Sequence, residues 1–298
     1  MIVRPKPSLL NIAIAMHGSI VPKIAWRLAL LAVVSLGAVL LMRLHPGPMG
    51  RFAAMPFTLI GLALSIFMSF RNTACYDRWW EGRKQWGALT IASRAFTRQI
   101  ALLDEAARPP LLMGLIGFAH GLNARLRSGD EAAAVGRWSP ARDWTSHPNP
   151  TDGVLAEVGA GCARLMTEGR INPMHYSVLE AQLTELSHVQ GACERIKATP
   201  LPFAFDLLLH RTAYLFCLLL PFAMAPVLGW WTPLLVVIVG YTFFGLDALG
   251  DEMEDPFGRE ANDLPLDAMV RTIERELLYA LGRTDLPPPL LPQHYVLT

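Results

Sequence analysis

The segment that most constrains this chain, residues 57–87, changes character at its midpoint. No charged residue occurs from Phe52 to Phe70, whereas a charge-rich stretch begins at Arg71. Proline is favoured at the first position of a helix, and no proline follows Pro56 in this segment. We therefore predict one helix from Pro56 to beyond Gln85. At about 1.5 Å per residue such a helix would cross a bilayer and extend into the water beyond it.

The apolar half carries large side chains at a helical spacing. Leu62, Ile66 and Phe70 fall at i, i+4 and i+8, which places them in one stripe on one helix face. Two interpretations remain open at this point, ordinary packing against lipid or core, and a hydrophobic constriction that lines a pore. Small residues beside the stripe would let other helices approach closely: Gly61, Ala63, Ser65 and Ser69.

The composition indicates a membrane protein. Only 17% of the residues are charged, against about 25% in soluble domains, and residues 212–246 contain no charged side chain. The net charge of +1 gives no reason to expect nucleic-acid binding, which needs a concentrated basic face. The four cysteines form no CxxC pair, and neither an HExxH motif nor a Ser/His/Asp grouping occurs. We therefore predict no disulfide framework, no zinc site built from the cysteines and no enzymatic activity.

Four membrane spans are expected. The first runs from Ile24 to Met42, the second is the apolar half of the central helix, and the last two lie between Asp206 and Gly250. We expect the last two spans to be divided by Pro221, Pro226, Gly229 and Pro233. Basic residues after the second span and before the third place both termini in the cytoplasm. The short apolar run Leu9–Met16 lacks a convincing cleavage site, so we expect no cleaved signal peptide and a location in the cell inner membrane.

The remaining segments read as amphipathic helices. They are expected over residues 89–127 with a break at Pro109-Pro110, and over three later ranges: 154–168, 174–198 and 266–281. The resulting organisation has four parts. A lead-in with two spans (1–100) is followed by a cytoplasmic helical region (101–205), two spans (206–250) and a cytoplasmic tail (251–298). Asp206, His210 and Arg211 begin the third span and Asp247 ends the fourth, where interfacial ion pairs would satisfy them.

Three motifs resemble the bestrophin ion-channel family, in its bacterial form. They are SFRNTACYDRWWEGRKQWG at 69–87, CERIKATPLPFAF at 193–205 and GDEMEDPFGREANDLPLD at 250–267, and they occur in the family order. The resemblance implies an all-α membrane protein that assembles as a homopentamer around one central pore lined by the second helix. It implies passive ion conduction, with the lipid bilayer and permeating ions as partners.

The resemblance also implies which residues line the pore. Leu62, Ile66 and Phe70 would form three stacked apolar rings, a neck that opens by wetting rather than by binding ions. Met174, soon after Gly169, falls on the position of the family's narrow cytoplasmic aperture. Animal members conduct anions and bacterial relatives favour monovalent cations, so the bacterial form of the motifs favours cations. An anion channel of the same architecture and a secondary transporter are the alternatives.

The acidic residues of the third motif make calcium the one candidate cofactor. Animal bestrophins hold calcium where the third motif lies, in a dense acidic string together with main-chain oxygens near the N-terminus. In this chain Arg259, Ala261 and Asn262 interrupt the string and leave Glu260 and Asp263 as candidate ligands. The EF-hand spacing is absent. We expect no required cofactor, and the competing interpretation of the acidic run is a solvated, partly paired surface.

Overall fold

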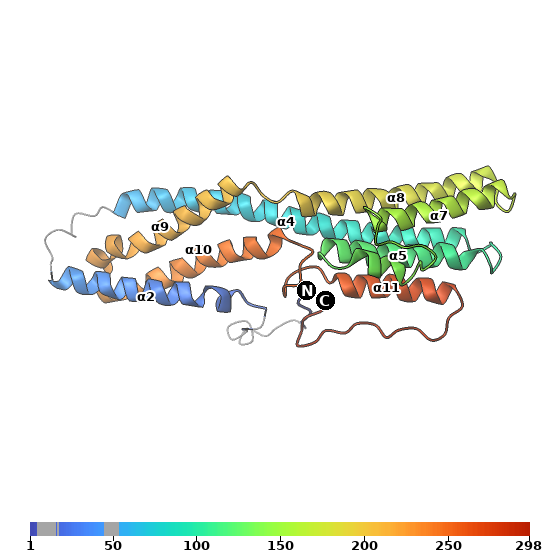
Figure 1. Ribbon diagram of the computed structural model, residues 1–298. Helices are drawn as coiled ribbons and strands as arrows, with labels where there is room; N and C mark the ends of the chain where they lie inside the picture. Colours follow the sequence, from blue (N-terminus) through green and yellow to red (C-terminus); the bar gives the residue numbers. More distant parts are fainter. Residues whose placement is uncertain (5–15, 17, 45–53) are drawn as a thin grey trace. The chain divides into compact units, whose positions relative to one another are not determined.

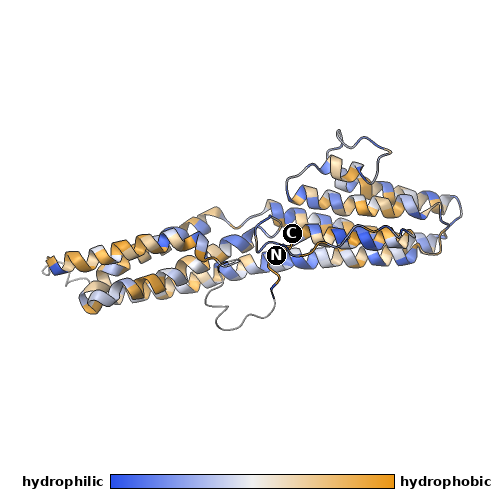
Figure 2. Ribbon diagram, turned by 90° about the horizontal axis from the view of Figure 1, so that it is seen from below, coloured by the Kyte–Doolittle hydropathy of each residue, from blue (hydrophilic) through white to orange (hydrophobic). Residues whose placement is uncertain are grey.

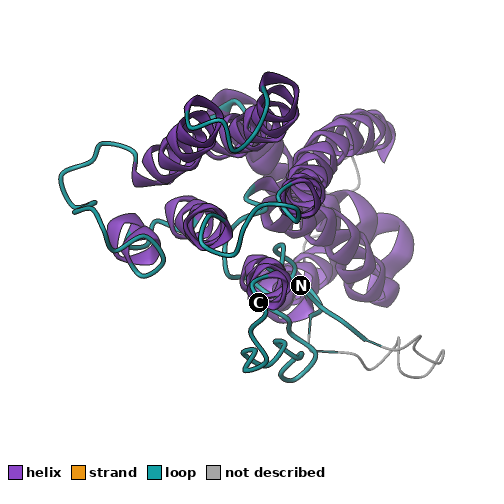
Figure 3. Ribbon diagram, turned by 90° about the vertical axis from the view of Figure 1, so that its right-hand side faces the viewer, coloured by secondary structure: helices purple, strands orange, loops and turns teal. Residues whose placement is uncertain are grey.

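A computed structural model describes residues 1–4, 16, 18–44 and 54–298 of the chain (Figure 1). Within these residues the secondary structure is helical (Figure 3), and β pairing is limited to two isolated bridges, Ile2 with Val296 and Gln293 with Val296. The all-helical prediction is therefore confirmed. The chain forms two compact units, one of residues 5–78 and 200–255, called the span unit, and one of residues 1–4, 79–199 and 256–298, called the bundle unit.

The span unit contains the apolar helices. They are α2 (Val21–Leu44), the first part of α4 (Ala54–Gln99), α9 (Phe203–Leu228), the short 3-10 helix η1 (Gly229–Trp231) and α10 (Thr232–Glu254). Figure 2 shows hydrophobic residues concentrated on α2, α9 and α10. Three stretches are long and apolar enough to cross a membrane: Val21–Leu44, Met55–Gln99 and Phe203–Glu254. These stretches contain the spans predicted from the sequence.

The turn between α9 and α10 is shorter than predicted. Gly229 ends α9 in the left-handed region with φ 52°, which glycine adopts without strain, and Pro233 lies in the first turn of α10. Pro221 and Pro226 do not divide the spans as expected, because both lie inside α9. Apolar helices tolerate internal proline where neighbouring helices and local backbone adjustments satisfy the freed carbonyl groups.

Close approach of helices in the span unit depends on glycine. Gly61 of α4 packs against Phe216 of α9, and a Cβ added there would lie 3.1 Å from the phenyl ring. Gly240 of α10 packs even more tightly against Leu31 of α2, whose side chain is 1% exposed. The contact at Gly61 is the kind expected from the small residues beside the stripe.

We predict opposite effects of alanine at two glycines of this unit. Gly240→Ala should lower stability by about 1–3 kcal/mol, because the added methyl group collides with buried Leu31. Gly37→Ala on α2 is the matched control, since nothing lies within 4 Å of its Cβ position and alanine favours the helix by about 1 kcal/mol. Thermal unfolding midpoints in detergent measure both changes. Equal midpoints for the two variants would contradict the packing described here.

The bundle unit contains the amphipathic helices. They are the rest of α4, α5 (Arg108–Leu126), α6 (Glu131–Gly136), α7 (Pro150–Thr167), α8 (Pro173–Ala198) and α11 (Leu266–Ala280). Their core includes Trp86, Phe96 and Phe118, each at most 1% exposed. The start of α7 at Pro150 differs from the predicted 154, because the side chain of Asn149 caps the helix by accepting the N–H of Asp152.

The two ends of the described chain pair with each other inside the bundle unit. The N–H of Val3 donates to the carbonyl of Tyr295, and the N–H of Leu297 donates to the carbonyl of Met1. The carbonyl of Thr298 accepts the N–H of Ala268 in the first turn of α11. The sequence analysis divided the chain into four consecutive parts, whereas the two compact units each combine segments that are distant in the sequence. The four-part organisation stays a prediction.

Candidate functional site

The stripe on α4 faces away from the core of its own subunit. Leu62, Ile66 and Phe70 are 60%, 48% and 63% exposed, whereas Leu64 and Met68 are at most 2% exposed. The buried pair packs with α9 and α10 in one apolar cluster. Packing inside the subunit therefore does not account for the stripe, which leaves lipid, a pore or a neighbouring chain as its surroundings. Its assignment as the neck stays a prediction.

The exposed stripe is longer than the sequence analysis proposed. Leu59 and Met55 continue it toward the N-terminus of α4, at 61% and 74% exposed. The same i, i+3, i+4 spacing could have found both residues. Ile60 and Phe67 are also exposed but lie on the adjacent face of α4. Exposure alone therefore does not distinguish a pore-lining side chain from a lipid-facing one.

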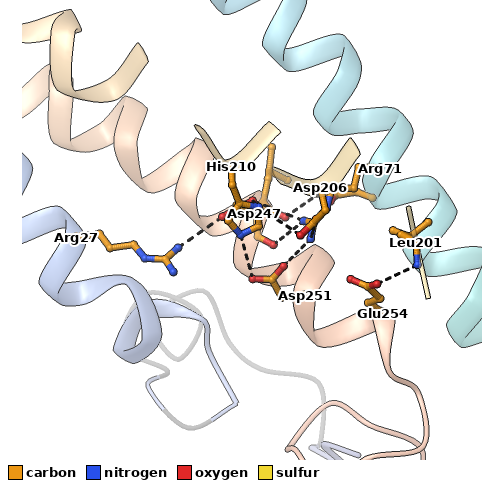
Figure 4. A network of polar contacts seen from close by, with 10 residues as sticks. Arg27, Arg71, Leu201, Asp206, His210, Asp247, Asp251 and Glu254 are labelled. Carbon is orange, nitrogen blue, oxygen red and sulfur yellow. Dashed lines mark hydrogen bonds and ion pairs between the residues drawn. The ribbon is translucent and has the colours of Figure 1, made fainter. Parts of the chain in front are cut away.

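Arg71 follows the stripe directly and is completely buried. Its Nη2 atom lies 2.5 Å from Oδ1 of Asp206 on α9 and 2.5 Å from Oδ1 of Asp251 on α10. Its Nη1 atom donates to the main-chain carbonyl of Asp247 over 3.1 Å. One guanidinium group thus joins the first charged turn of α4 to both following helices of the span unit (Figure 4).

Asp247 is as fully enclosed as Arg71. Its carboxylate has no exposed surface and lies 3.6 Å from Arg71 and 3.6 Å from Arg27 of α2. Nδ1 of His210 lies 3.3 Å from its Oδ1 atom. The sequence analysis expected ion pairs at an interface for Asp206, His210 and Asp247. The ion pairs are present, but at Asp247 they are enclosed by protein, where an unpaired charge would be costly.

A glycine makes room for this arrangement. A Cβ atom added to Gly250 of α10 would lie 2.5 Å from Nη1 of Arg71 and 2.7 Å from Oδ1 of Asn72. The side chain of Asn72 in turn donates to the carbonyl of Leu246 over 3.0 Å. The approach of α4 to α10 at these polar groups therefore requires a residue without a side chain at position 250.

Met174 lies in the first turn of α8 and is 79% exposed. The side chain of Asn172 caps this helix by accepting the N–H of His175 over 2.7 Å, and Nε2 of His175 lies 2.8 Å from the carbonyl of Gln99 at the end of α4. Leu102, which follows α4, is 95% exposed and was missed by the sequence analysis. The role of Met174 as an aperture stays a prediction.

Glu260 and Asp263 share a tight turn. Oδ2 of Asp263 accepts the N–H of Glu260 over 2.7 Å, and the carbonyl of Glu260 accepts the N–H of Asp263 over 3.2 Å. Asp263 is only 3% exposed. The next residue back, Asn262, accepts the indole N–H of Trp79 through its carbonyl. Asp263 therefore stabilises the turn itself. Its role as a calcium ligand stays a prediction.

The thiols of the bundle unit are buried and poorly reactive. Burial raises the pKa of Cys162 to about 11 and the pKa of Cys193 to about 12. Both side chains have no exposed surface. A thiol becomes a nucleophile only as the thiolate, so neither cysteine is suited to covalent chemistry near neutral pH.

Comparison with known proteins decides the family. A family model described as Bacterial/Fungal Bestrophin protein matches residues 1–279. This chain belongs to the bacterial and fungal bestrophin family. The resemblance inferred from the three motifs is thereby confirmed, and the long apolar helices are those of a membrane protein.

Relatives of this bestrophin are similar over nearly their whole length. A voltage-dependent anion channel-forming protein of Mesorhizobium japonicum is 43% identical over 296 residues, which cover 98% of this chain and 95% of the relative. A protein of the same description from Escherichia coli is 38% identical over 304 residues, with both chains fully covered. The crystal structure of a bacterial bestrophin homolog from Klebsiella pneumoniae matches at a TM-score of 0.84 and 38% identity, over 87% of this chain and 99% of that chain.

Proposed function

We propose that this bestrophin is a passive ion channel that conducts small anions across a cell membrane. The observation that carries the proposal is the full-length similarity to relatives described as voltage-dependent anion channel-forming proteins. The preference for cations, expected from the bacterial form of the motifs, has no support in those descriptions. Enzymatic activity is not part of the proposal, since the relatives are described as channel-forming proteins.

A reversal potential tests the permeant ion. Purified protein in a planar bilayer with a potassium chloride gradient should pass current without a coupling ion, because a passive pore needs none. The current should reverse near the equilibrium potential of chloride. Reversal near the potassium potential would reject anion conduction and support the cation channel. Transport that strictly requires a coupling ion would instead indicate a secondary transporter.

The proposed architecture has four spans and both termini in the cytoplasm of a bacterial inner membrane. The helices α9 and α10 contain 26 and 23 residues. At about 1.5 Å per residue each is long enough for a hydrocarbon core of about 30 Å. The short helix η1 between them would lie at the membrane surface, where Trp230 and Trp231 are favoured.

The pore itself would form between copies of the chain. We propose a homopentamer in which α4 of each subunit lines one central pore, with Leu62, Ile66 and Phe70 as three apolar rings and Met174 as a second, cytoplasmic constriction. The exposure of all four side chains in the single subunit supports this arrangement. Rings of this kind have no groups that replace the hydration shell of an ion, so they would gate by excluding water.

The neck can be tested by shortening its side chains. The triple variant Leu62→Ala, Ile66→Ala and Phe70→Ala should raise unitary conductance without moving the reversal potential, because the pore widens and no charge changes. The matched control is Ile60→Ala, at an exposed residue on the adjacent face of α4. The control should leave unitary conductance unchanged.

The conductances can be compared only if every variant assembles as the native protein does. Light scattering should give each variant a protein mass of about five times 32.9 kDa. A stable monomer or dimer of the native protein would reject the central pore. An assembled triple variant with native conductance would return the stripe to lipid or subunit packing.

We further propose that conduction does not require calcium. The motivation is the interruption of the acidic string by Arg259, Ala261 and Asn262, together with the use of Asp263 in a turn. Anion flux should therefore change little between a chelator and micromolar calcium. Steep activation by calcium that Asp263→Asn abolishes, while Asp267→Asn preserves it, would show that a calcium site exists at this turn.

A further inference from the structure

Two pairs of side chains of the types that can ligate metal ions face each other in the span unit (Figure 4). Asp206 and His210 are four residues apart on α9, and Asp247 and Asp251 are four residues apart on α10. Residues at this spacing share one face of a helix, so each helix presents a pair of side chains toward the other. Facing helices with such pairs are a common way to build a metal site inside a helical bundle.

The charges of this cluster do not balance. Among the residues that the structure describes, the carboxylates of Asp206, Asp247 and Asp251 face two guanidinium groups, those of Arg71 and Arg27. When the imidazole of His210 is neutral, one negative charge remains uncompensated. The cluster therefore favours one additional cation.

The distances around His210 indicate what kind of cation fits. Its Nδ1 atom lies 3.8 Å from Oδ2 of Asp206, and its Nε2 atom lies 3.8 Å from Oδ2 of Asp251. These separations exceed the 2.7–3.2 Å of typical hydrogen bonds to nitrogen. These two separations end on opposite ring nitrogens, and an ion is held by one of them. Donor atoms placed about 2.0–2.2 Å from a tetrahedral ion lie roughly 3.3–3.6 Å apart, close to the 3.8 Å between either nitrogen and its neighbouring carboxylate oxygen. One donor atom from each of the three residues lies within 4.8 Å of the other two.

A buried carboxylate without a hydrogen bond provides independent support. Asp247 has no exposed surface, and neither of its carboxylate oxygens accepts a hydrogen bond. Its Oδ1 atom points toward Nδ1 of His210, which is itself buried and without a hydrogen bond. Polar atoms of this kind are normally satisfied in protein interiors. An ion held by His210 would place a positive charge beside this carboxylate.

Arg71 leaves room for such an ion. Its Nη2 atom contacts the Oδ1 atoms of Asp206 and Asp251, whereas the Oδ2 atoms of both residues lie toward the imidazole. Each carboxylate can therefore bridge the guanidinium group and a metal ion. Charged groups behind the ligands commonly orient them in this way in metal sites.

We propose that Asp206, His210 and Asp251 bind one divalent transition-metal ion per subunit, of the zinc class. Asp247 and Arg71 are positioning residues in this site. Imidazole with carboxylate ligands suits zinc and cobalt, whereas calcium favours sites made of oxygen atoms alone. The site lies in the span unit of a single chain and does not depend on the proposed channel activity or on the calcium turn at Asp263.

Cobalt binding to the full-length protein tests the site. Protein purified in detergent and stripped with a chelator is titrated with Co²⁺, whose visible absorption reports tetrahedral coordination. We expect one ion per subunit in the native protein. His210→Ala should weaken binding by about 100-fold or more, since loss of outer partners alone costs 10–100-fold. The matched control is His188→Ala, an exposed histidine on α8, which should bind as the native protein does.

A second variant and a second measurement guard against misfolding. His210→Gln keeps a polar side chain of similar size but is a poor zinc ligand, and its mass by light scattering should equal that of the native protein. Zn²⁺ should raise the thermal midpoint of the native protein and of His188→Ala, but not that of His210→Gln. Absence of Co²⁺ binding to the native protein would overturn the proposal, as would equal binding by a correctly assembled His210→Gln. A midpoint that responds through His210 to pH alone, and not to Zn²⁺, would also overturn it by identifying the extra cation as a proton.

Discussion

The buried guanidinium group of Arg71 is the interaction on which the span unit depends. Removal of its charge from water is costly, and the cost is offset only by carboxylates held close with good geometry. Asp206 and Asp251 supply that geometry from two different helices. The position of Arg71 therefore sets where α9 and α10 meet α4, immediately after the last residue of the exposed stripe. Loss of Arg71 would leave buried carboxylates poorly paired, whereas loss of an exposed ion pair would change little.

Much of the fold could be predicted from local features of the sequence. The uncharged runs predicted the apolar helices, and Gly229 with Pro233 predicted the turn between α9 and α10. Asn172 followed by Pro173 marks the start of α8 within one residue of the predicted boundary. Pro221 and Pro226 were misleading, because a proline rule learned from water-exposed helices does not hold where other helices satisfy the freed carbonyl groups. The pairing of residues 1–4 with the chain's last residues was not predictable, since the single bridge between Ile2 and Val296 carries no alternating pattern.

One part of the candidate site could be predicted from the sequence and another part could not. The helical spacing of Leu62, Ile66 and Phe70 is evident from the sequence. The stripe is exposed because Leu64 and Met68, on another face of α4, are the residues that pack into the subunit. The network around Arg71 pairs it with Asp251, 180 positions later in the chain, and no local spacing specifies such a pairing. Charged residues near helix ends are usually satisfied by water or lipid head groups. Only the packing of three helices shows that Asp247 is enclosed.

Gly250 has a consequence for how this sequence can change over time. The space that its side chain would occupy is filled by the guanidinium group of Arg71 and the amide of Asn72. A substitution at position 250 is therefore tolerated only after Arg71 has become shorter, and a shorter residue at position 71 leaves three carboxylates with too little positive charge. Arg71 restricts the size of the residue at position 250, and the surrounding carboxylates restrict the charge of the residue at position 71. Any lineage that replaces one of them must pass through a less stable protein unless it replaces both.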